Sequence, residues 1–91
     1  MLIRSQDKRM IVNFDNICTV SAFSEKDSED IYVEDGTGSL MVGRYSTKAK
    51  AMKVLDMIQK AYCKFMSVKN DDAWSGKESV FYMPEDSEVE I

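Results

Sequence analysis

The fold is decided by residues 46–67, which read STKAKAMKVLDMIQKAYCKFMS. On a helical wheel, the apolar residues of this stretch fall on one face at the i, i+3, i+4, i+7 spacing of an amphipathic helix. They are Ala51, Val54, Leu55, Ile58, Ala61, Tyr62 and Phe65. Ser46 is a favourable N-cap, because its hydroxyl can accept a hydrogen bond from a backbone N–H group of the first turn. The stretch therefore predicts one long helix over residues 47–67.

The residues before this helix carry the patterns of antiparallel strands. Residues 2–5 and 10–13 flank a polar turn, which is typical of a hairpin. Asp15-Asn16 is a second turn signal. Residues 17–23 then alternate apolar and polar side chains, as a half-buried strand does.

A third hairpin is indicated around Asp35-Gly36. This dipeptide favours a type I′ turn, which needs positive φ at both central residues. The flanking residues 31–34 and 40–42 read as strands, and the charged residues 24–30 read as a loop. Three hairpins in succession predict an antiparallel meander.

The chain after the helix predicts one more strand and a tail. Residues 80–83 favour a short strand that Pro84 ends, and residues 85–91 form an acidic tail that we expect to be frayed. An amphipathic helix and a one-sided sheet each need a partner for their apolar face. The predicted fold is therefore a single α+β domain over residues 1–84, with an antiparallel β-meander packed on one long amphipathic helix and a short C-terminal strand.

Composition points to a cytoplasmic protein. No apolar run approaches the roughly 18 residues of a membrane span, and residues 1–7 lack the charged-then-apolar order of a signal peptide. Cys18 and Cys63 are then expected to be reduced. They could form a redox pair, but we favour two small buried hydrophobic side chains.

The absence of histidine from the sequence removes the usual general base, the Ser-His-Asp triad and the common zinc sites. We therefore expect no enzyme, no cofactor and no metal site. Catalysis by carboxylates alone would need residues such as Asp7, Asp15 or Glu34 to converge in a cleft with raised pKa values.

The predicted helix concentrates positive charge in an acidic chain of net charge −4. Residues 46–67 carry one aspartate, Asp56, and five lysines, which are Lys48, Lys50, Lys53, Lys60 and Lys64. Three hypotheses explain them: the solvated side of the helix, a phosphate-binding surface for nucleic acid, or a surface covered by the acidic tail of this chain or of a dimer mate. We favour the solvated side, because the helix has no arginine and nucleic-acid surfaces are usually rich in it.

Three further residues are candidates for an interaction surface. Trp74 is the only tryptophan in the sequence, so it could anchor a protein partner, although we favour a lid over one end of the core. Met52 and Met57 flank the apolar stripe of the helix, where they could fill gaps in the core or sit at a dimer seam.

Four stretches resemble a family of small uncharacterised proteins of Gram-positive bacteria and their phage-like elements. They are residues 3–8 (IRSQDK) with Val12-Asn13, residues 43–47 (GRYST), Ala51 with residues 54–58 (VLDMI), and residues 80–86 (VFYMPED). Similar sequences tend to carry an acid where Ala49 stands, which would complete a capping box with Ser46. The resemblance implies a cytosolic accessory protein and supplies no active site.

The sequence thus favours a non-enzymatic protein-interaction or regulatory accessory module that binds a protein partner or itself as a homodimer. The alternative is a nucleic-acid-associated regulator that uses the lysine-rich face of the helix.

Overall fold

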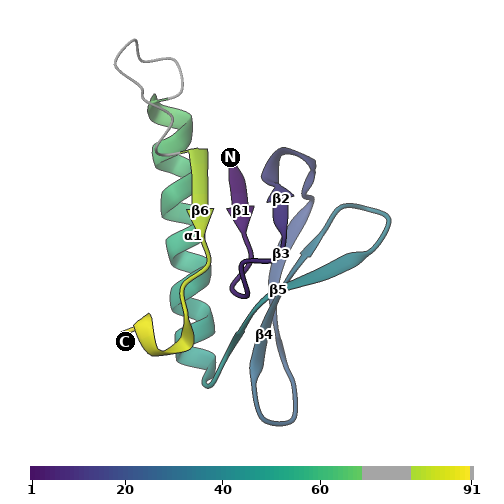
Figure 1. The fold of residues 1–91 in the computed structure, drawn as a ribbon, viewed down its shortest axis with the longest axis vertical. Coiled ribbons are helices and arrows are strands. Elements are labelled where there is room, and N and C mark those ends of the chain that lie inside the picture. Colours follow the sequence, from purple (N-terminus) through teal and green to yellow (C-terminus); the bar gives the residue numbers. More distant parts are fainter. Residues whose placement is uncertain (69–78, 91) are drawn as a thin grey trace.

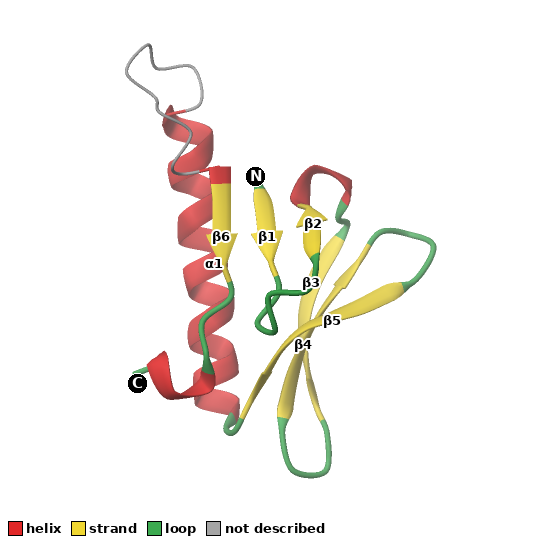
Figure 2. Cartoon of the chain, in the orientation of Figure 1, coloured by secondary structure: helices red, strands yellow, loops and turns green. Residues whose placement is uncertain are grey.

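The computed structural model describes residues 1–68 and 79–90 of the chain. Within these residues one long helix lies beside two small sheets, as Figures 1 and 2 show. The elements are β1 (Leu2–Arg4), β2 (Ile11–Asn13), η1 (Phe14–Asn16), β3 (Thr19–Ser24), β4 (Glu29–Glu34), β5 (Ser39–Tyr45), α1 (Lys48–Val68), β6 (Val80–Tyr82) and η3 (Asp86–Glu88).

The strands form two three-stranded sheets. We call the sheet with strand order β2-β1-β6 sheet A and the sheet with order β3-β4-β5 sheet B. Sheet B is an antiparallel meander, and β1 pairs antiparallel with β2 but parallel with β6. The predicted α+β class, with its meander, long helix and short C-terminal strand, is confirmed.

The predicted hairpin between β2 and β3 is wrong, because the chain changes sheet there. Asn13 Oδ1 accepts a hydrogen bond from the backbone N–H of Asp15 at 3.0 Å, and this bond caps the short helix η1. Ile17 N–H then donates to Phe14 O at 3.1 Å. The turn signal at Asp15-Asn16 therefore marks a tight helical turn, from which β3 departs into the second sheet (Figure 1).

The core lies where α1 meets the inner faces of both sheets. The predicted apolar face of α1 is confirmed: Ala51, Val54 and Ile58 are buried, and the rest of the stripe packs against the core. Sheet A contributes Ile3 and Val12 to this core, and sheet B contributes Ile31, Val33, Val42 and Tyr45. Burial of these side chains supplies the main driving force for folding.

The start of α1 is capped one residue later than predicted. Thr47 Oγ1 accepts the hydrogen bond of Lys50 N–H at 3.2 Å. Ser46 instead donates from its N–H and its hydroxyl to Asp86 Oδ1, at 2.8 and 3.1 Å. The prediction of Ser46 as the N-cap is wrong because a carboxylate 40 residues away binds it.

The turn between β4 and β5 is longer than the predicted type I′ turn. Glu34 pairs with Ser39, and the Asp35 side chain accepts hydrogen bonds from the N–H groups of Thr37 and Gly38. Gly36 has a φ of 94°, whereas Asp35 has no positive φ. A turn of this kind is stabilised when an aspartate side chain accepts a hydrogen bond from the backbone N–H group two residues later. The preceding loop is shorter than predicted, because β4 already begins at Glu29.

Both cysteines are exposed, so the prediction that they are buried is wrong. Cys18 lies between η1 and β3, where the chain crosses between sheets. Cys63 follows Tyr62 on α1 and falls just outside the apolar stripe.

The tail was expected to be frayed, but residues 85–90 pack onto the fold. Val89 is buried in the core cluster, and the Asp86 carboxylate lies 3.5 Å from Lys50 Nζ. The tail thus folds back on the beginning of α1. Within the described residues, it forms no ion pair with Lys53 or Lys60.

Candidate functional site

The outer face of sheet A is apolar and uncovered. Strand register places six residues on it in two rows, Asn13–Leu2–Val80 and Ile11–Arg4–Tyr82. Ile3, Val12 and Phe81 point to the opposite, core side. The exposed fractions are 37 % for Leu2, 57 % for Ile11 and 60 % for Tyr82. Three large apolar side chains are therefore exposed on one face, with Arg4 between Ile11 and Tyr82.

Positive charge borders this face at the turn between β1 and β2. Arg4 Nε donates to the backbone carbonyl of Lys8 at 2.8 Å, and Lys8 Nζ lies 5.6 Å from the centroid of the Tyr82 ring. In the described part of the chain, no carboxylate forms a salt bridge with Arg4 or Lys8. The sheet A outer face is thus apolar and locally cationic.

A hydrogen-bond network fixes the turn that positions these cations. The buried Ser5 hydroxyl donates to Asp7 Oδ1 at 2.6 Å and accepts from Met10 N–H at 3.1 Å. Arg9 N–H also donates to Asp7 Oδ1. The hydrogen bond from Ser5 lowers the pKa of Asp7, so this carboxylate is ionised at neutral pH. Asp7 therefore acts as part of the turn.

The outer face of sheet B has a different character. The rings of Phe23 and Tyr32 meet edge to face with their centroids 5.7 Å apart. Phe23 is 51 % exposed, and Met41, which pairs with Tyr32 across the sheet, is 40 % exposed. A shallow depression here is lined by Phe23, Glu25, Tyr32, Glu34 and Ser39. This face therefore sets two carboxylates beside an aromatic pair.

A buried ion pair underlies the sheet B face. Asp30 is fully buried, and Arg44 holds it in a bidentate contact, with Nε–Oδ1 at 3.0 Å and an Nη–Oδ2 distance of 3.1 Å. The Arg44 hydrogen bonds are the main reason that the pKa of Asp30 is lowered, and Ser28 adds a further donor. Because Asp30 neutralises Arg44, Glu25 and Glu34 determine the charge of this face.

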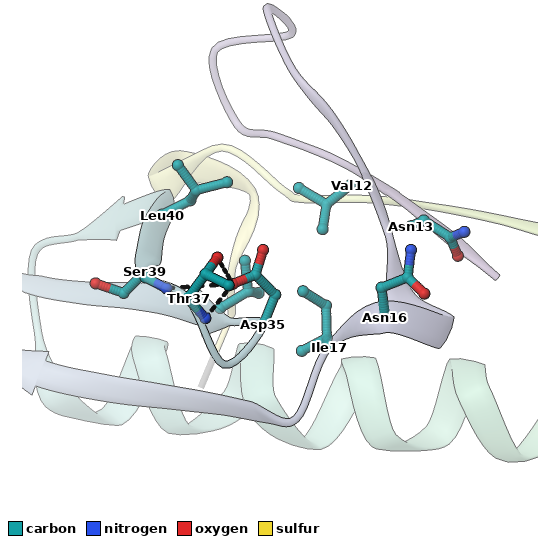
Figure 3. A pocket seen from close by; sticks show the side chains of 10 residues that line it. Val12, Asn13, Asn16, Ile17, Asp35, Thr37, Ser39 and Leu40 are labelled. Carbon is teal, nitrogen blue, oxygen red and sulfur yellow. Dashed lines mark hydrogen bonds between the residues drawn. The ribbon is translucent and has the colours of Figure 1, made fainter.

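A cavity of about 290 Å³ lies beside β2 and the β4–β5 turn (Figure 3). Its lining combines the apolar side chains of Val12, Ile17 and Leu40 with polar ones such as Asn16 and Asp35. Asp35 Oδ1 accepts hydrogen bonds from the Thr37 hydroxyl at 2.7 Å and from two backbone N–H groups, which lower the pKa of Asp35. Thr37 and Ser39 contribute hydroxyl groups to the lining of this cavity.

A second cavity of about 350 Å³ runs along α1. It is lined mainly by apolar side chains, among them Phe14, Leu55 and Tyr62, and the exposed Cys63 lies at its edge. The Phe14 and Tyr62 rings pack with centroids 5.1 Å apart. Among the described residues, none of those that line this groove is charged.

The residues predicted from the sequence are not gathered into one site. Lys48, Lys53, Lys60 and Lys64 are exposed on α1, whereas Lys50 is partly buried and donates to the Asp86 carbonyl at 2.9 Å. Met52 is 45 % exposed, and Met57 is partly buried. Trp74 lies outside the described residues.

The exposed residues on sheet A were missed by reasoning from the sequence. One signal was available: β1, β2 and β6 each carry two adjacent apolar residues, namely Leu2-Ile3, Ile11-Val12 and Phe81-Tyr82. Because neighbouring residues of a strand point to opposite faces, such pairs indicate a sheet that is apolar on both sides.

Two kinds of feature are absent from residues 1–68 and 79–90. These residues contain no group of three or more Cys, Asp or Glu side chains placed to hold a metal ion. No helix there is long and apolar enough to cross a membrane. Comparison of the chain with protein-family models, with curated proteins and with solved structures finds no match.

Proposed function

We propose that this chain is a non-enzymatic protein-interaction module, acting as a cytoplasmic accessory or regulatory protein, and that it binds through the sheet A outer face. The single observation that carries the proposal is the exposure of Leu2, Ile11 and Tyr82 around Arg4 on one face of sheet A, which no described residue covers. Exposed apolar groups that are contiguous and rimmed by polar residues are typical of protein-binding surfaces.

The charge at this face favours an acidic partner. Arg4 retains free guanidinium N–H groups after its contact with the Lys8 carbonyl, and Lys8 adds a second cation beside Tyr82. A partner segment with apolar side chains would bury them against this face. A carboxylate of the same segment would pair with Arg4 or Lys8. Tyr and Arg are also the residue types enriched at interface hot spots.

The non-enzymatic part of the proposal is supported by the states of the carboxylates. Hydrogen bonds lower the pKa values of Asp7 and Asp35, and an ion pair lowers that of Asp30. A general acid or base that works near neutral pH needs a carboxylate pKa that is raised. The Asp7 and Asp35 carboxylates therefore stabilise turns, and the Asp30 carboxylate forms an ion pair. All three are poorly suited to proton transfer near neutral pH.

A peptide-display selection tests the proposal. Peptides selected on the wild-type protein are expected to combine acidic with aromatic or aliphatic residues. Their affinity for a Tyr82→Ser/Ile11→Ser variant is expected to fall at least about tenfold, because two apolar contacts of the interface are lost. The affected side chains are mainly in solvent, so the variant is expected to keep the fold.

The control is Lys53→Ser/Lys60→Ser on the exposed side of α1. Selected peptides that bind this variant as well as the wild type, but not the sheet variant, support the proposal. Peptides that fail to bind only the Lys53→Ser/Lys60→Ser variant would contradict the proposal. They would favour the nucleic-acid alternative, for which salt-sensitive DNA or RNA binding is the matching observation.

A further inference from the structure

The chain carries two exposed apolar faces of opposite charge. The segment that builds β1, β2 and their turn, residues 1–16, has three basic residues, Arg4, Lys8 and Arg9, and two acidic residues. The segment that builds sheet B, residues 19–45, has six acidic residues against Lys26 and Arg44. Charge is therefore segregated between the two sheets.

We propose that a second copy of this chain occupies the sheet A outer face and binds it with its sheet B outer face. This inference rests on the proposed function and names the partner. The sheet B face has the chemistry that the sheet A face calls for: Phe23, Tyr32 and Met41 are apolar, and Glu25 and Glu34 are acidic.

The proposed contact sets the basic and apolar side chains of the sheet A face against the acidic and apolar side chains of the sheet B face. An arginine or lysine side chain from the sheet A face can lie against the Phe23–Tyr32 pair, where the ring faces attract cations and Glu25 and Glu34 provide carboxylates. Ile11 and Leu2 can then cover the exposed side chains of Phe23 and Met41. Two sheets that pack face to face bury side chains of both in this way.

A head-to-tail arrangement fits better than a symmetric one. In a two-fold dimer that pairs sheet A with sheet A, or sheet B with sheet B, patches of like charge face each other. Placing sheet A against sheet B pairs opposite charges instead. A pair joined in this way leaves the sheet B face of one copy and the sheet A face of the other free, so further copies can add at either end.

Light scattering over a range of concentrations tests the inference. The average mass of the wild type is expected to rise continuously with concentration and to fall with added salt, because salt screens the charge pairs. A Tyr82→Ser/Ile11→Ser variant loses the sheet A face, and a Phe23→Ser/Met41→Ser variant loses the sheet B face. Each alone is expected to stay monomeric, with unchanged circular dichroism.

Mixing the two variants gives the decisive result. Each retains the face that the other lacks, so an equimolar mixture is expected to form a dimer of twice the monomer mass that does not grow further. If the sheet B variant still assembles as the wild type does, sheet A pairs with itself and the inference is wrong. A wild type that is monomeric at all concentrations also overturns it. The proposed function would survive that result if selected peptides still bind sheet A.

Discussion

Replacing Gln6 with alanine is expected to lower the free energy of unfolding by about 2–4 kcal/mol, since it removes three hydrogen bonds of roughly 1 kcal/mol each. The Gln6 side chain accepts from Arg44 N–H at 2.9 Å, donates to the Arg44 carbonyl at 3.0 Å and donates to the Pro84 carbonyl at 3.2 Å. Its backbone N–H also donates to the Val42 carbonyl at 2.8 Å. Gln6 thus joins sheet A to the edge of sheet B.

Urea denaturation of Gln6→Ala measures this effect, and Gln59→Ala is the matched control. Gln59 is an exposed residue of α1 far from the junction between the sheets. The control is expected to change stability by less than about 0.5 kcal/mol, as surface substitutions usually do. Equal effects of the two substitutions would show that the Gln6 bonds do not hold the sheets together.

Replacing Arg44 with methionine is expected to lower the melting temperature by roughly 10 °C, because it leaves the Asp30 carboxylate buried without its partner. Methionine keeps much of the aliphatic volume of arginine but cannot donate hydrogen bonds. Ser28 would remain as a donor to Asp30 and limits the loss. Thermal unfolding followed by circular dichroism measures the change.

The effect of Arg44→Met is expected to depend on pH in a defined direction. The Arg44 hydrogen bonds lower the folded-state pKa of Asp30 below its ordinary value, so their stabilisation is fully present at neutral pH. It is lost as pH falls through the folded-state pKa, and the difference between variant and wild type should shrink below about pH 4. The double variant Asp30→Leu/Arg44→Met has no stranded charge and is expected to regain stability. A pH-independent difference would contradict this account.

The elements that could be predicted are those encoded by neighbouring residues. The apolar period of residues 51–65 is enough to specify α1, and the first and third hairpins follow from short strands around polar turns. The junction between the two sheets involves Gln6, whose side chain binds residues 38 and 78 positions away. No local pattern shows such a contact.

The same limit explains Ser46 and Gly43. Ser46 fits the N-cap preference locally, but Asp86 recruits it. A Cβ atom on Gly43 would lie 3.0 Å from Met83 Cε and 3.0 Å from Tyr45 Cε2, so glycine is needed for close packing rather than for a turn. The Tyr45 hydroxyl also donates to the Pro84 carbonyl at 2.8 Å. Residues 3–8, 43–47 and 80–86 thus meet at one junction.

The candidate residues predicted from the sequence differ from those that the structure exposes on sheet A. The lysines of α1 are candidates because their charge is evident from the sequence alone. In the structure, Lys50 forms an ion pair with Asp86. Tyr82 and Ile11 looked like ordinary strand residues, because the sequence does not show that sheet A lacks a cover on its second face. Whether an apolar side chain is covered depends on tertiary packing.

Methyl chemical shifts of the wild type, titrated with a selected acidic peptide, test most directly whether sheet A is the binding surface. The account predicts shifts at the methyl groups of Leu2, Ile11 and Val80, which share the outer face, with little change at Met52 on α1. Shifts confined to α1, with Leu2 and Ile11 unchanged, would contradict it and place binding on the helix.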